Sequence, residues 1–246
     1  MLRVALALLL LSGCGGPRRV AVQLLLPDLS GAETPLPGVE IVALPYDRDS
    51  VLRMLEARAP SERPHTRELD SLFQAFRVPF LRFARAAWQV EQTRRSRDSL
   101  AAQRSALGPD SPAAHELGAQ IARFDDSLRR LTPELERGRA ALSAARDTLW
   151  PRITPLQADV RRWETSTYAG YDTIVRGLVR DRLRLGLADT TDMMGWASLQ
   201  LDSGRWWIYA RSPDPQDPHG QWYWNLPVQA DTLRLSPATG RHLSRY

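Results

Sequence analysis

The side chains that most often carry catalysis are sparse in this chain of 246 residues. Cys14 is the single cysteine, and four histidines are scattered along the sequence. This cysteine count excludes a disulfide framework, a cysteine-rich zinc site and a Cys-x-x-Cys redox pair. The sequence also lacks the His-Glu-x-x-His, Gly-x-Ser-x-Gly, phosphate-loop and dinucleotide-binding motifs. We therefore expect a protein that is not an enzyme and that has no cofactor and no metal site.

The remaining polar candidates have simple interpretations. His219 lies among proline, aspartate and glycine, where we expect a solvated turn histidine. Asp125 and Asp126 fall on a charged helix face, so solvation explains them better than Ca²⁺ binding. Asp189 and Asp192 are expected to shape a turn.

Tryptophans are the strongest candidates for binding. Trp206, Trp207, Trp222 and Trp224 lie close together in the C-terminal part of the chain. Successive strand residues point to opposite faces, so Trp206 and Trp207 must diverge, whereas Trp222 and Trp224 share a face. Exposed indole faces stack on sugar rings, which would make this region a glycan-binding surface. In the alternative interpretation the four side chains pack inside the protein.

The first residues read as an export signal. One arginine and a short apolar run precede small residues, and this run is too short to span a bilayer as a helix. The sequence Leu11-Ser12-Gly13-Cys14 resembles the lipobox of bacterial lipoproteins. The resemblance implies removal of residues 1–13, lipid on Cys14 and a lipidated linker over residues 14–19. An ordinary signal peptide with an incidental cysteine is the alternative.

Several acyl chains would anchor the protein firmly to a membrane. Gly15, and not an aspartate, follows the cysteine, and the resemblance to bacterial lipoproteins then implies sorting to the outer membrane if the cell has one. The formal net charge of +5 and the pI near 9.9 would also suit nucleic acid. Export and the interspersed acidic residues favour a solvated mixed-charge surface instead, so we expect no nucleic-acid partner.

The chain divides into three regions, of which the outer two are β-rich. Strands are predicted over 20–26 and 39–44, then over 196–201, 205–210, 221–228 and 232–235. Residues 46–188 have a helical pattern between them. We therefore predict an α+β fold in which residues 20–45 and 189–246 form one small antiparallel β-sandwich interrupted by a helical insertion.

Within the insertion, apolar residues recur at alternating steps of three and four from Leu117 to Leu149. Ser111 and Pro112 suit the N-cap and the first helical position after a turn at Gly108. Two polar-rich helices around this turn predict an antiparallel coiled-coil hairpin. Its arm, 89–146, should project from the body. The base should pack near the sandwich; it holds Phe73, Phe76, Phe80, Phe83 and the Trp163 helix.

Two prolines and one threonine affect the expected helix limits. Pro79 should kink the first helix of the hairpin, and Pro133 should bend or restart the second, with Thr132 as a cap. A further helical stretch is expected over 155–180.

The flanking strands carry a family resemblance. The segment from Pro35 to Ile41 is similar to the opening hairpin of carboxypeptidase-regulatory-like, transthyretin-like β-sandwich domains. Residues 191–196 and 201–210 resemble the later part of that family, in which a Thr-Asp-x-x-Gly turn leads to two strands. The resemblance implies a β-sandwich fold.

These observations predict a non-enzymatic, membrane-anchored lipoprotein of the cell envelope with a structural or protein-binding role. The expected partners are the membrane, through Cys14, and another protein. The alternative is a lipoprotein that binds carbohydrate or peptidoglycan through the tryptophan-rich C-terminal region.

The lipid anchor has a direct test. Replacing Cys14 with serine removes the only sulfur to which lipid can attach, so Cys14→Ser should abolish labelling by radioactive fatty acid and release the chain from the membrane fraction. An unlabelled wild-type chain would contradict the lipobox interpretation.

Overall fold

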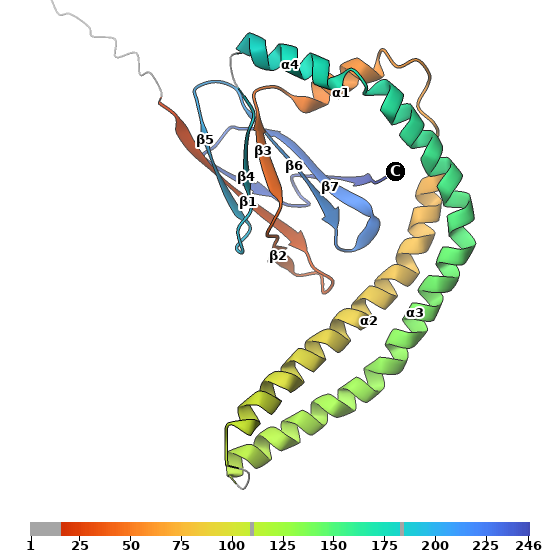
Figure 1. Cartoon of the computed structure of the whole chain (residues 1–246), viewed down its shortest axis with the longest axis vertical. Helices are drawn as coiled ribbons and strands as arrows, with labels where there is room; N and C mark the ends of the chain where they lie inside the picture. Colours follow the sequence, from red (N-terminus) through yellow and green to blue (C-terminus); the bar gives the residue numbers. More distant parts are fainter. Residues whose placement is uncertain (1–15, 109–110, 183–184) are drawn as a thin grey trace, which may run out of the picture.

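Two β-sheets pack face to face at one end of the molecule (Figure 1). The computed structural model describes residues 16–108, 111–182 and 185–246. In the first sheet β1 (Arg18–Pro27) pairs with β5 (Trp196–Leu201), with β2 (Glu33–Pro35) and with β8 (Thr232–Leu235). The second sheet has the order β4 (Leu187–Thr190), β3 (Glu40–Leu44), β6 (Trp207–Asp214), β7 (Asp217–Pro227) and β9 (Arg241–Ser244).

The hydrophobic core fills the space between the sheets. Alternate residues of β1 and β5 enter it from one side, and Ile41, Ile208 and Ala210 enter it from the other, all nearly or fully inaccessible to solvent. Trp224 is 1% exposed and is the largest of the fully buried side chains. Burying each such side chain stabilises the fold by roughly 1.5–3 kcal/mol, so this core is the main source of stability of the sandwich.

The predicted union of the N- and C-terminal strands is confirmed. β1 pairs antiparallel with β5, in the register Val20 with Leu199, and β3 pairs antiparallel with β6, in the register Ile41 with Ala210. β8 runs parallel to β1, unlike the antiparallel pairs around it. Both sheets therefore need strands from both ends of the chain.

Several short elements differ from the sequence prediction. β2, β4 and β9 have only three or four residues each and lie in segments where no strand was predicted. The proline- and aspartate-rich segment after Ala210 is not a long loop, because β6 continues to Asp214 and β7 starts at Asp217. These residues pair across the sheet with a register shift at Pro213 and Asp214.

The helices form the connection between β3 and β4. Helix α1 (Arg48–Glu56) follows β3, and α2 (Arg67–Ser105) and α3 (Pro112–Thr167) form a long antiparallel hairpin. Helix α4 (Tyr171–Arg182) then leads back to β4. The Ser111 side chain accepts a hydrogen bond from the Ala114 amide and Pro112 opens α3, which confirms the predicted start.

The predicted restart of the helix at Pro133 is wrong. Helix α3 is continuous through Pro133, Pro151 and Pro155, and α2 is continuous through Pro79. Thr132 is not a cap, because its hydroxyl donates to the Leu128 carbonyl inside the helix. A proline removes one helical hydrogen bond and favours bending, and both helices are curved in Figure 1. The long packed seam keeps each helix intact across these positions.

The hairpin leaves the sandwich at its base and extends well beyond it (Figure 1). Phe73 and Phe76 are buried at this base, as expected. Phe83 lies further along α2, opposite Gly138 of α3. A Cβ added at Gly138 would lie only 3.1 Å from the Phe83 backbone. Glycine at 138 therefore allows α2 and α3 to approach closely. Among the described helices, none combines the length and apolar character needed to cross a bilayer.

The turn between β4 and β5 depends on Gly195. Its φ is +73°, and an added Cβ would lie 2.5 Å from the Leu24 carbonyl oxygen. Gly31 has a similar φ of +92° but nothing within 4 Å, so it is a matched control for backbone strain alone. We expect Gly195→Ala to reduce the free energy of unfolding by about 2 kcal/mol more than Gly31→Ala, measured by urea denaturation. Equal losses would contradict this account of the turn.

Candidate functional site

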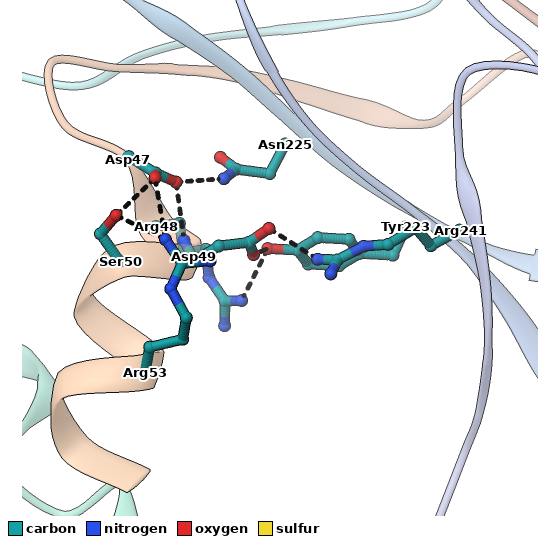
Figure 2. A network of polar contacts seen from close by, with 8 residues as sticks. All are labelled: Asp47, Arg48, Asp49, Ser50, Arg53, Tyr223, Asn225 and Arg241. Atoms are coloured by element: carbon teal, nitrogen blue, oxygen red, sulfur yellow. Dashed lines mark hydrogen bonds and ion pairs between the residues drawn. The ribbon is translucent and has the colours of Figure 1, made fainter. Parts of the chain in front are cut away.

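A polar network joins the start of α1 to the outer face of the second sheet (Figure 2). Asp47 caps α1 by accepting from the Asp49 amide at 3.0 Å, and its same oxygen accepts from the Asn225 side chain at 2.6 Å. Burial opposes ionisation of Asp47, but the hydrogen bonds from Ser50, Asn225 and the backbone lower its pKa overall. One charged carboxylate thus fixes both the first turn of α1 and its position on β7.

Asp49 makes the second connection to the sheet. The Tyr223 hydroxyl donates to one Asp49 oxygen, and the Arg241 guanidinium donates to the other at 2.7 Å. Arg48 donates to the Tyr223 oxygen at 3.3 Å. Burial and the bond to Asp49 raise the pKa of Tyr223 to about 12, so its hydroxyl stays a neutral donor at physiological pH. Figure 2 shows these side chains converging from α1, β7 and the C-terminal segment.

Arg48 also packs among tyrosines from three elements. Its guanidinium carbon lies 4.8 Å from the ring centre of Tyr209 in β6, 5.4 Å from that of Tyr171 in α4 and 5.8 Å from that of Tyr223. Cation–π contacts of this kind are worth about 0.5–2 kcal/mol each, depending on solvation. Arg48 therefore holds α1, α4 and the sheet together.

A separate aromatic contact fixes the base of the hairpin, and we call it the His219 contact. The His219 ring stacks on Phe73 of α2 with centroids 4.2 Å apart and planes 7° apart. Phe76 of α2 and Trp150 of α3 approach the same ring at 5.6 and 5.4 Å. One imidazole from β7 thus contacts both helices of the hairpin.

Charged groups surround the His219 contact. Arg77 of α2 donates to the Gln216 carbonyl at 3.2 Å and lies 4.0 Å from the buried Asp217 carboxylate. The C-terminal residues add to this contact, because Ser244 and Tyr246 both donate to Asp70 of α2. Strands β7 and β9 therefore hold the hairpin through its first turns.

The expectation of a solvated His219 is wrong. The ring is half-buried, and its Nε2 atom has no hydrogen-bond partner among the described residues. Desolvation lowers its pKa, an effect that Arg245 reinforces and Asp217 opposes. No local sequence signal shows this environment, because Phe73 and Trp150 come from distant parts of the chain. Asp192 shapes a turn as expected, accepting from the Met194 and Trp196 amides.

The four candidate tryptophans do not form one binding face. Trp206 and Trp224 are buried, and their indole nitrogens donate to the carbonyls of Asp202 and Ser236. Trp222 is half-buried beside Trp224, with ring centroids 6.4 Å apart, as their shared face predicts. Trp207 is also half-buried, and it alternates along β6 with the core residue Ile208.

The remaining candidates from the sequence are Cys14 and the acidic pair Asp125 and Asp126. Cys14 lies outside the described residues. Asp125 accepts from Arg97 of α2 at 3.1 Å, and Asp126 pairs with Arg129, so both acids take part in charge pairs of the hairpin. Within residues 16–108, 111–182 and 185–246, no three or more histidine, cysteine or acidic side chains converge as a metal site would require.

Comparisons of the chain with protein-family models, with curated proteins and with solved structures find no match.

The His219 contact predicts a pH dependence of stability. Because the folded-state pKa of His219 is below its unfolded value, the unfolded chain binds the proton more readily. The stabilisation from the neutral ring is therefore complete above about pH 6.5 and is lost as the pH falls through the folded-state pKa. We expect His219→Phe, which keeps an aromatic ring but cannot be protonated, to lose less unfolding free energy than the wild type between about pH 7.5 and pH 5. An identical loss in both proteins, measured by urea denaturation, would contradict this role of His219.

Proposed function

We propose that this protein is a non-enzymatic lipoprotein of the cell envelope that binds another protein through its helical hairpin. The observation that supports this proposal is the contrast between the two ends of the hairpin. The side chains that tie α2 to the sandwich, Asp70, Phe73, Phe76 and Arg77, all lie in the first turns of the helix. Beyond them the hairpin extends away from the sheets (Figure 1), and from here on we call its residues 78–144 the arm.

The arm is long enough to reach a distant partner. Helix α2 has 39 residues and would span about 58 Å at 1.5 Å per residue. Ion pairs lie on the surface of both helices, for example Arg95 with Glu91 on α2 and Arg139 with Glu136 on α3. Exposed pairs of this kind contribute at most about 1 kcal/mol each. The hairpin is therefore stabilised by its internal seam, and its outer surface is available for contacts.

The proposed anchor suits this arrangement. Cys14 precedes the first residue of β1, Arg18, by a few residues, so a lipid on Cys14 would hold the start of β1 close to the membrane surface. In Figure 1 the start of β1 and the tip of the hairpin lie at opposite ends of the molecule. The arm would then reach away from the membrane, with the outer membrane as the favoured location in a cell that has one. This proposal includes a relationship between the β-sandwich and carboxypeptidase-regulatory-like domains.

Removal of the arm tests the proposal. The bond of Arg97 to Asp125 defines which residues of α2 and α3 lie opposite each other, and so does the position of Arg104, whose side chain would lie 3.5 Å from a Cβ added at Gly118. By this register, replacing residues 78–144 with a short Gly-Ser linker leaves the base and its His219 contact in place. The variant should fold, with the near-ultraviolet tryptophan signal of the sandwich retained, and should lose the cross-linked adducts that the wild type forms in intact membranes.

Two results would contradict the proposal. An unfolded variant would show that the arm is part of the core, and a folded variant that keeps every adduct would show that the arm is not the binding surface. The carbohydrate alternative is tested in the same samples by titrating soluble peptidoglycan fragments: quenching of tryptophan fluorescence would support it.

A further inference from the structure

A groove runs between the two helices of the arm near its base, and we call it the arm groove. Val78, Leu81, Arg82 and Arg85 of α2 line one wall, and Glu134 and Arg137 of α3 line the other. Its volume is about 670 Å³. The α2 residues recur at steps of three and four, so they form a second stripe along the helix, beside the one buried in the hairpin.

The arm groove exposes apolar surface that the hairpin does not use. Val78 is 64% exposed, whereas Phe76, two residues earlier, is 7% exposed. Leu81 is only half-buried. An apolar stripe at helical spacing beside an existing helix pair is the kind of surface on which a third helix packs.

The charged side chains that line the arm groove are mainly positive. From Ser71 to Val90, α2 contains three arginines and no acidic residue. Arg77 is held by Gln216 and Asp217, but Arg82, Arg85 and Arg137 have no hydrogen-bond or ion-pair partner in the part of the chain that the structure describes. Glu134 is the one carboxylate in the lining.

These features determine the chemistry of a suitable occupant. A neutral or basic helix over the groove would remove water from arginines without giving them partners, which is unfavourable. Acidic side chains on both sides of an apolar stripe would bury Val78 and Leu81 and pair with the guanidinium groups at the same time.

We propose that the arm groove binds an amphipathic helix of a partner protein, with an apolar stripe flanked by aspartate or glutamate. This inference rests on the proposed protein-binding function of the arm and assigns the contact to one segment of it.

The test uses the full-length Cys14→Ser protein and two synthetic fluorescent peptides. Both peptides are helices of about three heptads with leucine at the core positions, and they differ only in carrying glutamate or lysine at the flanking positions. We expect the glutamate peptide to bind at least about tenfold more tightly than the lysine peptide, and its affinity to fall with added salt. Fluorescence anisotropy measures both affinities.

Charge-matched variants localise the binding. Arg82→Glu/Arg85→Glu should weaken binding of the glutamate peptide by about tenfold or more, because it replaces attraction with repulsion. Arg94→Glu/Arg123→Glu makes the same change in net charge at exposed arm positions outside the groove and should have a much smaller effect. Removal of residues 93–129 keeps the groove lining and should leave binding intact. Circular dichroism confirms that each variant retains its helical content.

Each other outcome overturns the proposal. Equal binding of the two peptides, equal effects of the two charge reversals, or loss of binding on removal of residues 93–129 would rule out the arm groove as the site. Binding of phosphatidylglycerol vesicles in place of the peptide would identify a lipid surface instead. If removal of residues 78–144 abolishes cross-linking in membranes but Arg82→Glu/Arg85→Glu does not, the arm function stands and this inference fails. If neither variant affects cross-linking, both fail.

Discussion

The helical insertion begins and ends on two hydrogen-bonded neighbouring strands, β3 and β4, and the rest of the architecture depends on this pairing. Ala43 lies opposite Leu187, so the chain leaves the sheet and returns to it at adjacent positions. The pairing of the strands in the sandwich therefore does not depend on the length of the helices inserted between β3 and β4. A long arm can extend from such a point without disturbing the core.

The direction of the arm depends on a second set of contacts. A helical hairpin attached only through its two connections would be free to swing, but α1 and the base of the hairpin are bound at separate places on the sheet. The bonds from Asn225 and Tyr223 hold α1. The His219 ring contacts both helices of the hairpin. Because these groups are partly or fully buried and well packed, each loses more when displaced than an exposed ion pair would.

The long elements were predictable because their signals are local. The repeated steps of three and four, the Ser111 cap and the turn at Gly108 together indicate the hairpin, and the β-rich segments at both ends indicate a sandwich. The short strands β2, β4 and β9 were missed because three or four residues carry too little alternation to be distinguished from a loop. Pro133 misled the prediction because packing along the seam outweighs the local effect of one lost hydrogen bond.

The contacts at the base were not predictable from the sequence. Asp49 and Tyr223 are 174 positions apart, and neither has a sequence context that marks it as a partner of the other. His219 lies among turn-forming residues, and only the fold brings Phe73 and Trp150 to its ring. The tryptophans show the same limit: alternation along a strand correctly separates faces, but it does not determine which face the rest of the chain covers.

The central claim, that the arm is held in one direction relative to the sandwich, can be measured directly. Gln92 in α2 and Gln229 after β7 are both exposed, so spin labels can be attached at Gln92→Cys and Gln229→Cys in the Cys14→Ser protein. Double electron–electron resonance then gives the distribution of distances between the arm and the sandwich. A fixed arm predicts one narrow distribution that broadens when Asp49 and His219 are both replaced by alanine. A broad distribution in the protein with both residues intact would contradict the claim.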